Sequence, residues 1–296
     1  LLSDSHDVDF NWTPDRVPAS FKLERGPADP FFVKVADRLG LAAMSDDWSR
    51  ATAISRHLLG SSGKTLRGGA VRLDLRHTYL RITVDGEGYC SDFVHTFMAI
   101  AIASGMQVRA WAFSFDGFGG HGHIWPEIWN RQLGRWQLVG VFNNYYFYET
   151  AGEPLSAMEI RRAMLSGSKL LRMASIDPTS RPGWKIEEKA WEYYRRGLDE
   201  WYMWWGNNVF TYERSSLVSM FAGISRSLEQ FGGIVQGVSP RLQILVTPEN
   251  QRQVKAIEQL RLHLRIVGAA LAVSFLLMLA SLSRSFWRRR KVRGSR

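Results

Sequence analysis

The sequence predicts an α+β fold in which one helix packs on an antiparallel sheet, followed by a helical C-terminal region and one transmembrane helix. Three observations support this prediction. Apolar side chains recur at helical spacing from Cys90 to Ser104, and three runs typical of strands follow directly. Near the C-terminus, an uncharged run of 18 residues extends from Ile266 to Ser283.

The first two segments precede the central helix. Residues 1–45 contain four prolines and little periodicity, so we expect an extended lead-in. The main domain is predicted at residues 46–148. It opens with a helix at Asp46–Leu59, which begins with two acidic residues and stops before Gly60.

The central segment contains the expected core. Residues 66–86 are irregular, with short strands expected near Val71 and Leu80. The predicted helix Cys90–Ser104 has an acidic residue, Asp92, in its first turn. The three strands are predicted at Gln107–Phe115, His123–Asn130 and Arg135–Val141.

Residues 149–250 are predicted to form a mainly helical accessory region. Ser156 and Glu159 have the spacing of a capping box at a helix start. Large apolar residues then repeat at three- and four-residue steps within 184–205, which predicts one helix face. These residues are Trp191, Tyr194, Leu198, Trp201 and Trp205. Core packing is the favoured interpretation of this face; a sugar-stacking groove and a lipid contact are the alternatives.

The distribution of charge excludes several classes of protein. The chain has 38 Lys and Arg against 28 Asp and Glu, but residues 252–296 contain eleven of the basic residues and one acidic residue. The other 251 residues are therefore neutral, with 27 of each sign, which argues against a basic surface for nucleic acid. A hydrophobic content of 45% argues against disorder, and one cysteine excludes an intramolecular disulfide or a multi-cysteine metal site.

The excess of basic residues surrounds a predicted membrane anchor. As a helix, the 18 uncharged residues would span ~27 Å, close to the ~30 Å hydrocarbon core of a bilayer. We predict a juxtamembrane helix at 251–265, a transmembrane helix at 266–286 and a basic cytoplasmic tail at 287–296. A buried core helix is the alternative.

The flanking charges predict the orientation of this anchor. Seven basic residues follow the uncharged run and four lie in the fifteen residues before it. The positive-inside rule then places the tail in the cytoplasm and the main domain outside it. Because an exported domain needs a signal peptide or an upstream membrane helix, we expect the natural protein to be longer at its N-terminus.

Cys90 and His123 are the candidate catalytic residues. Cys90 lies at the predicted helix start, where free N–H groups and the helix dipole favour the thiolate. His123 begins a predicted strand, from which an imidazole could serve as base and then as acid. An inert, buried cysteine is the alternative for Cys90 taken alone.

Residues 46–148 resemble the transglutaminase-like superfamily of papain-type cysteine enzymes, as a membrane-anchored member of bacterial type. The matching residues are Gly88, Cys90, Asp92 and Phe93, then Ala103 to Met106 with Arg109, then His123, Trp125, Glu127 and Trp136. The resemblance implies that Cys90 is the nucleophile and His123 the base, with the Cys90 backbone N–H in an oxyanion hole.

The third catalytic position departs from this family. The family usually has an Asp four residues after the Trp that corresponds to Trp136, and here that residue is Gly140. Asn144 has the same strand parity as Gly140, so it is the tentative residue that orients the imidazole. Asn143 would point to the other face of a regular strand, and Glu127 resembles a structural position of the family.

Two functions are compatible with these residues. The favoured one is a membrane-anchored cysteine acyl-transfer enzyme (a peptidase, amidase or transamidase) that acts through a thiolate–imidazolium pair. The alternative is a catalytically degenerate module that binds an envelope peptide, a glycan or a membrane partner. Gly140 favours the module, whereas the presence of both Cys90 and His123 favours the enzyme.

The expected partners are a peptide or protein amide substrate and the lipid bilayer, with no nucleic acid. No cofactor and no metal are predicted. A zinc site that combines His121 and His123 with Asp116 or Glu127 is a weaker alternative, because no third ligand stands at a recognisable spacing.

Overall fold

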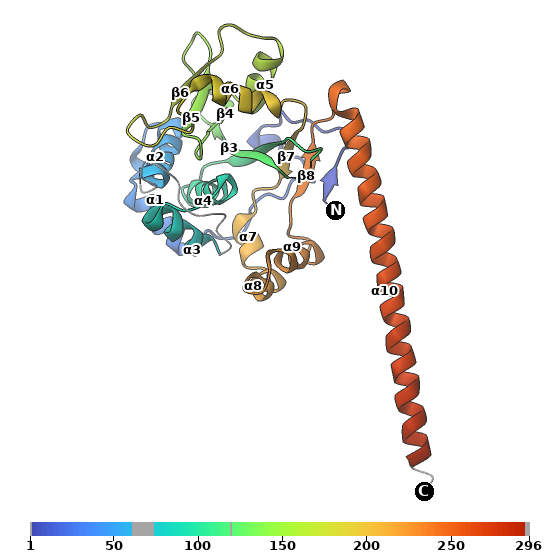
Figure 1. Ribbon diagram of the computed structural model, residues 1–296. Coiled ribbons are helices and arrows are strands. Elements are labelled where there is room, and N and C mark those ends of the chain that lie inside the picture. Colours follow the sequence, from blue (N-terminus) through green and yellow to red (C-terminus); the bar gives the residue numbers. More distant parts are fainter. Residues whose placement is uncertain (1, 61–73, 119, 294–296) are drawn as a thin grey trace.

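Six strands form one sheet at the centre of the computed structural model, which describes residues 2–60, 74–118 and 120–293 (Figure 1). Their order is β1-β8-β7-β2-β3-β4, and all neighbours are antiparallel except β1 and β8. The strands are β1 (Ser3–Asp4), β2 (Val108–Ser114), β3 (Gly122–Asn130), β4 (Arg135–Leu138), β7 (Trp201–Trp205) and β8 (Arg241–Ile244). A separate hairpin pairs β5 (Tyr145–Tyr148) with β6 (Arg172–Ser175).

Helices cover this sheet, so the protein has the predicted α+β class. The α-helices are α1 (Pro30–Arg38), α2 (Asp47–Gly60), α3 (Leu75–Leu80), α4 (Cys90–Ala103), α5 (Ala157–Leu165), α6 (Glu187–Arg196), α7 (Val209–Glu213), α8 (Ser216–Ala222), α9 (Arg226–Val235) and α10 (Gln251–Arg293). Short turns of other helix types are η1 (Pro14–Arg16), η2 (Leu41–Ala43), η3 (Arg81–Asp85) and η4 (Pro248–Asn250).

The alternation of side chains in β2 explains how α4 packs on the sheet. Ala110 and Ala112 face α4, and their small side chains let the helix approach closely. Helices α1, α2 and α3 cover the other side of α4, so this helix is apolar on nearly every face. The other face of β2 presents Trp111 and Phe113, which pack with the lead-in and α6 in a cluster of aromatic rings.

Strand β7 corrects the prediction of a helix through residue 205. Helix α6 ends at Arg196, where Gly197 caps it, and Trp201–Trp205 is a strand between β8 and β2. Residues 149–250 contain the helices α5 to α9, but β7 and β8 of the same range complete the main sheet. The favoured core packing is confirmed, since Trp201 and Trp205 are both 1% exposed.

Several local predictions are confirmed and two are wrong. The predicted helix at 46–59 is α2, and Ser156 caps α5 together with Glu159. The lead-in is not uniformly extended, because Asp29 and Pro30 start α1. Leu80 lies in α3 rather than in a strand, and Val71 lies outside the described residues.

Helix α10 contains the predicted anchor. The predicted juxtamembrane, transmembrane and tail segments form one continuous helix to Arg293, and it projects away from the body (Figure 1). The helical stretch Pro248–Ser283, which combines η4 with most of α10, is long and apolar enough to cross a membrane. Its apolar window of 18 residues has a mean hydropathy of 2.3, and none of that window is buried.

Candidate active site

Cys90 is the first residue of α4, as the sequence predicts. The side chain of Asp92 accepts a hydrogen bond from the Tyr89 backbone N–H at 2.8 Å and fixes the start of the helix. Cys90 has a free thiol, and the backbone N–H groups of Ile124 and Ser91 donate toward its sulfur. The thiol therefore lies beside β3, next to the residue that follows His123.

The Ile124 N–H is available because β4 is short. Strand β4 pairs with β3 only from Glu127 onward, which leaves the start of β3 without a strand on that side. The Val139 N–H donates to the Pro126 carbonyl at 2.9 Å, so even-numbered residues of β3 turn their backbone groups toward this edge. Ile124 belongs to the same set, and its N–H meets the Cys90 sulfur.

His123 lies at the start of β3 among aromatic rings. Its side chain is buried, and it pairs across the sheet with Phe113. The ring centroids of Trp125, Tyr193 and Phe142 lie 5.0, 5.8 and 6.1 Å from the imidazole. Its Nε2 lies 3.5 Å from Nδ2 of Asn143. Among the described residues, the recorded contacts of the imidazole are aromatic rings and this amide.

Asn143, rather than the predicted Asn144, meets the imidazole. The parity argument fails because β4 ends at Leu138 and the chain then turns, with Asn144 in the left-handed region at φ 60°. The Asn144 amide instead accepts from the Asp177 N–H at 2.8 Å and donates to the carbonyls of Asp177 and Arg181. Asn144 therefore secures a loop, and it does not orient His123.

The Asn143 amide suits an orienting role. It is 6% exposed and lies 2.9 Å from the Tyr194 hydroxyl as well as beside His123. One end of an amide is an acceptor and the other a donor. The Asn143 Nδ2 group is a donor, and its two N–H bonds point to the Tyr194 hydroxyl and to Nε2 of the imidazole. Nε2 is then the acceptor, so the proton of the neutral imidazole lies on Nδ1.

Arg181 holds the segment that contains Asn143. Its guanidinium donates to the Phe142 carbonyl at 2.7 Å and lies over the rings of Phe142 and Phe93, at 5.1 and 5.8 Å from their centroids. Burial lowers the pKa of Arg181 to about 10, so it remains charged at neutral pH. Because Phe93 belongs to α4, these contacts connect the Asn143 segment to the helix that starts at Cys90.

Gly140 cannot be replaced by the usual Asp of the family in this geometry. Its N–H donates to the Tyr145 carbonyl at 2.8 Å, and its own carbonyl accepts from the Tyr145 N–H. A Cβ at this position would lie 2.4 Å from the Tyr145 carbonyl oxygen. The backbone bridge that brings residues 141–144 back toward His123 thus requires glycine.

Substituting alanine at Gly140 should therefore destabilise the protein. We expect Gly140→Ala to lower the free energy of unfolding by about 1–3 kcal/mol, because the added methyl group meets backbone rather than a movable side chain. Urea unfolding followed by tryptophan fluorescence measures this change. Gly223→Ala is the matched control, since nothing lies within 4 Å of its added Cβ. Equal stabilities of the two variants would contradict the close approach at Tyr145.

Burial keeps both candidate catalytic groups neutral. It raises the pKa of the Cys90 thiol, and the N–H groups of Ile124 and Ser91 offset this only in part. Burial also lowers the pKa of His123 to about 3. The sequence-based expectation of a stabilised thiolate is therefore wrong for the free protein, since desolvation outweighs the helix terminus.

Two tyrosines flank the thiol, and the sequence analysis did not single them out as site residues. Burial raises the pKa of Tyr193, and charge on Cys90 adds to the shift; both act on Tyr202 as well, raising its pKa to about 12. The Tyr193 hydroxyl also donates to the Gly122 carbonyl at 3.2 Å. Nothing in the local sequence distinguishes Tyr193 from the core aromatic residues around it.

The zinc alternative finds no support in the part of the chain that the structure describes. No group of three or more His, Cys, Asp and Glu side chains there could hold a metal ion. The side chain of His121 is 91% exposed whereas His123 is buried, so the two imidazoles do not converge. The carboxylate of Glu127 is bonded to Arg109 and Trp111.

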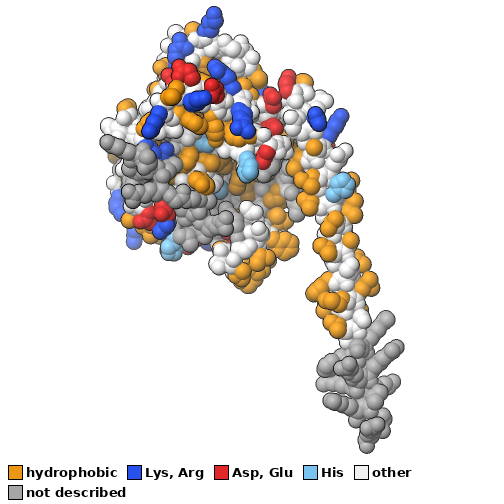
Figure 2. All heavy atoms as spheres, viewed as in Figure 1, with side chains coloured by type: hydrophobic (Ala, Val, Ile, Leu, Met, Phe, Trp, Pro, Cys, Tyr) orange, Lys and Arg blue, Asp and Glu red, His pale blue; other side chains and the backbone are white. Residues whose placement is uncertain are grey.

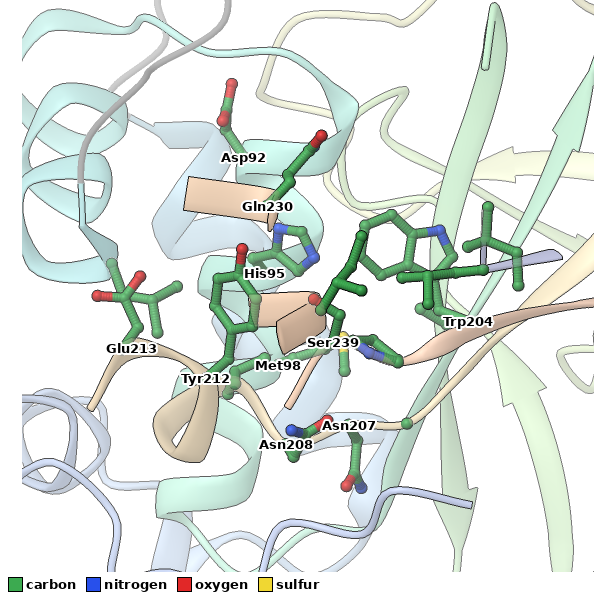
Figure 3. A pocket seen from close by; sticks show the side chains of 18 of the residues that line it. Asp92, His95, Met98, Trp204, Asn207, Asn208, Tyr212, Glu213, Gln230 and Ser239 are labelled. Atoms are coloured by element: carbon green, nitrogen blue, oxygen red, sulfur yellow. The ribbon is translucent and has the colours of Figure 1, made fainter. Parts of the chain in front are cut away.

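A cavity of about 350 Å³ lies along α4, on the side away from the aromatic cluster. Figure 3 shows Asp92, His95 and Met98 of α4 on one side of it and Trp204 of β7 on another. Residues of α7 and α9 close the remaining walls. Asp92 is two residues after Cys90, so the cavity begins near the start of the helix that carries the thiol.

Comparisons with known proteins give little further information. No protein-family model and no curated protein matches the sequence. Among solved structures, the chain is similar to one described as a "putative cysteine protease" from Cytophaga hutchinsonii, with 15% identity and a TM-score of 0.31. The match covers 53% of this chain and 55% of that chain, about half of each. At this TM-score the similarity carries no argument about activity.

Proposed function

We propose that this chain is a membrane-anchored cysteine acyl-transfer enzyme of transglutaminase-like type. The observation that supports this proposal is the Cys90 sulfur at the Ile124 N–H, one residue along β3 from His123, whose imidazole has an amide at Nε2. Acyl transfer of this kind uses a nucleophile, a base and a polar group that orients the base. The proposed substrate is a peptide or protein amide.

The neutral resting state determines the order of proton transfers. The Cys90 sulfur attacks the amide carbonyl carbon while His123 takes the thiol proton. The imidazolium then gives this proton to the leaving amine as the C–N bond breaks, which leaves a thioester on Cys90. Water or an amine attacks the thioester, and its proton returns through His123 to the Cys90 sulfur. The acceptor decides between hydrolysis and transamidation.

The first turn of α4 supplies a donor for the oxyanion. The backbone N–H of a first helical residue has no partner within the helix. In this proposal the Cys90 N–H donates to the carbonyl oxygen as it becomes negatively charged, which lowers the energy of the tetrahedral intermediate.

A binding module without turnover is the second candidate. Gly140 rules out the usual Asp at its position, and burial keeps the Cys90 thiol and the His123 imidazole neutral. These observations fit a protein that retains the site and binds an envelope peptide, a glycan or a membrane partner.

The membrane topology is also a proposal. Helix α10 would cross the bilayer with its uncharged run from Ile266 to Ser283. The larger number of basic residues after this run supports a cytoplasmic C-terminus, with the sheet and Cys90 on the other side of the membrane.

The role of His123 separates the two candidates. We expect p-nitrophenyl acetate to acetylate Cys90 in the full-length protein, as measured by intact mass. His123→Gln should slow this acylation by about 10²–10⁴-fold, because the base that removes the thiol proton is lost. Alkylation of Cys90 by iodoacetamide should be slow at pH 7 and should rise with pH, because burial raises the thiol pKa.

The comparison of the two reagents provides the control. Alkylation depends on the thiolate fraction, so His123→Gln should change its rate much less than the rate of acylation. Tyr148→Phe, at a half-buried position of the β5–β6 hairpin, controls for a general effect of substitution. If His123→Gln leaves the acylation rate unchanged, the imidazole is not the base and the binding module is the better proposal.

A further inference from the structure

Helices α8 and α9 pack against each other and carry an apolar face that points outward. Five large apolar side chains on this pair and the turn between the helices each expose between 40% and 68% of their surface. They are Met220, Ile224, Leu228, Phe231 and Val235. In α9, Leu228, Phe231 and Val235 stand at i, i+3 and i+7, which places them in one stripe along the helix.

This outward face is held in place by specific contacts. The Gln236 side chain accepts from the Leu217 N–H at 2.8 Å and donates to the Ser216 hydroxyl at 2.9 Å. Gly232 lies against Leu217, with backbone and side-chain atoms 3.0 Å from where a Cβ would be. Because the two helices are closely packed, α9 cannot rotate its apolar stripe inward without breaking these contacts.

The charges of this segment suit a lipid surface. Arg226 and Glu229 are the two charged residues between Ser215 and Gly237. Glu229 is 7% exposed, and its carboxylate accepts from the Tyr212 hydroxyl at 3.1 Å. The outward face therefore presents no exposed carboxylate to repel lipid phosphates, and exposed apolar area of this kind is typical of helices that lie at a membrane interface.

The position of the pair relates it to the anchor. Helices α8 and α9 form the end of the body toward which α10 runs (Figure 1), and hydrophobic side chains gather at that end and along α10 (Figure 2). Fifteen residues of α10, Gln251–Arg265, precede the uncharged run, a rise of about 22 Å. The bilayer would begin about this far along the helix, on the side of the body where α8 and α9 lie.

We propose that the α8–α9 pair lies on the surface of the same bilayer that α10 crosses, with Ile224 and Phe231 inserted among the lipid headgroups. The inference rests on the proposed membrane anchor and adds a second point of attachment. Two attachments prevent the body from swinging about α10. The start of α4 would then keep a constant orientation toward the membrane, which favours substrates that are themselves attached to it or lie close to its surface.

Site-directed fluorescence quenching tests this proposal on the full chain. In a Cys90→Ser background, single cysteines replace Ile224, Phe231, Leu165 and Ser274, and each is labelled with bimane. The protein is reconstituted in nanodiscs of phosphatidylcholine and phosphatidylglycerol, with or without lipids that carry a nitroxide either near the headgroup or deep in the acyl chain. We expect labels at 224 and 231 to lose at least about half of their fluorescence in nitroxide lipids.

Two controls make each outcome decisive. Leu165 is 50% exposed at the end of α5, far from α10's apolar run, so its label should keep its fluorescence. Ser274 lies at the middle of the uncharged run, so its label should be quenched by the nitroxide deep in the acyl chain. If 274 is quenched while 224 and 231 behave like 165, the surface contact is refuted although the anchor stands. If 274 is not quenched, the anchor itself fails. Energy transfer between labels at 231 on two copies, without lipid quenching, would show a contact between chains and overturn the proposal.

Discussion

Replacing Glu127 with Gln is expected to lower the free energy of unfolding by about 3–5 kcal/mol. The carboxylate is fully buried and accepts three hydrogen bonds: from Arg109 Nε at 2.6 Å, from Trp111 Nε1 at 3.0 Å and from the Ala157 N–H at 2.7 Å. Removing its charge takes away the anion that is hydrogen-bonded to a buried guanidinium, and this cost exceeds that of any single hydrogen bond.

The surroundings of Arg109 prevent its side chain from moving to water when the charge of Glu127 is removed. Its guanidinium lies over the rings of Trp136 and Trp12, at 3.9 and 4.9 Å, and donates to the Phe10 carbonyl at 2.9 Å. The side chain is 1% exposed and cannot reach water without opening the aromatic cluster. The Arg109–Glu127 pair thus joins the lead-in, the sheet and the start of α5.

A surface ion pair provides the control for Glu127→Gln. Lys189 and Glu192 lie 3.0 Å apart with side chains about 60% exposed, so Glu192→Gln should change stability by less than about 0.5 kcal/mol. Urea unfolding measured by fluorescence compares the two variants. Replacing both partners, as Arg109→Met with Glu127→Leu, should recover most of the loss, because no buried charge remains. A double variant as unstable as Glu127→Gln would refute this explanation.

The second large effect is a dependence of stability on pH that originates in His123. The imidazole has an ordinary pKa of 6.5, and burial lowers it to about 3 in the folded protein. Between these values the unfolded chain binds a proton that the folded chain does not. The stability that the neutral imidazole contributes to the folded protein is therefore fully present above pH 6.5. It is lost as the pH falls toward 3, by about 1.4 kcal/mol per pH unit.

Comparison with variants isolates this contribution from that of other groups. The difference in unfolding free energy between the wild type and His123→Gln should shrink by about 3 kcal/mol from pH 7 to pH 4. His123→Leu should show the same slope against the wild type, whatever its own packing cost, because neither replacement titrates. If the wild type and both variants lose stability in parallel, His123 is protonated normally in the folded protein, and an ion-pair mechanism would regain support.

The strand β7 shows where local pattern is ambiguous. Trp201 and Trp205 fit the helical spacing that begins at Trp191, but together with Met203 they also fit the two-residue period of a strand. All three side chains lie in the aromatic cluster. The position of this segment between β8 and β2 decides between the two periods, because its backbone completes the sheet there. That position depends on β2, more than eighty residues earlier, and on β8, roughly forty residues later.

Asn143 shows that local sequence pattern is also insufficient within the candidate active site. Alternation along a strand favours Asn144, and the reasoning holds only while the strand continues. The chain leaves β4 after Leu138 and folds back on itself through the bridge between Gly140 and Tyr145, the first residue of β5. This reversal moves Asn143 to the imidazole and Asn144 to the loop at Asp177.

The sequence by itself determined the α+β class, the cysteine at the start of a buried helix, the histidine at the start of a strand and the apolar run of α10. These features follow from local spacing of side chains and from helix and strand periods, which need no knowledge of distant neighbours. Only the tertiary structure decided which amide meets His123 and which protonation states the pair adopts. Burial under Tyr193, Phe142 and Trp125 sets those states, because desolvation depends on every residue that excludes water from the site.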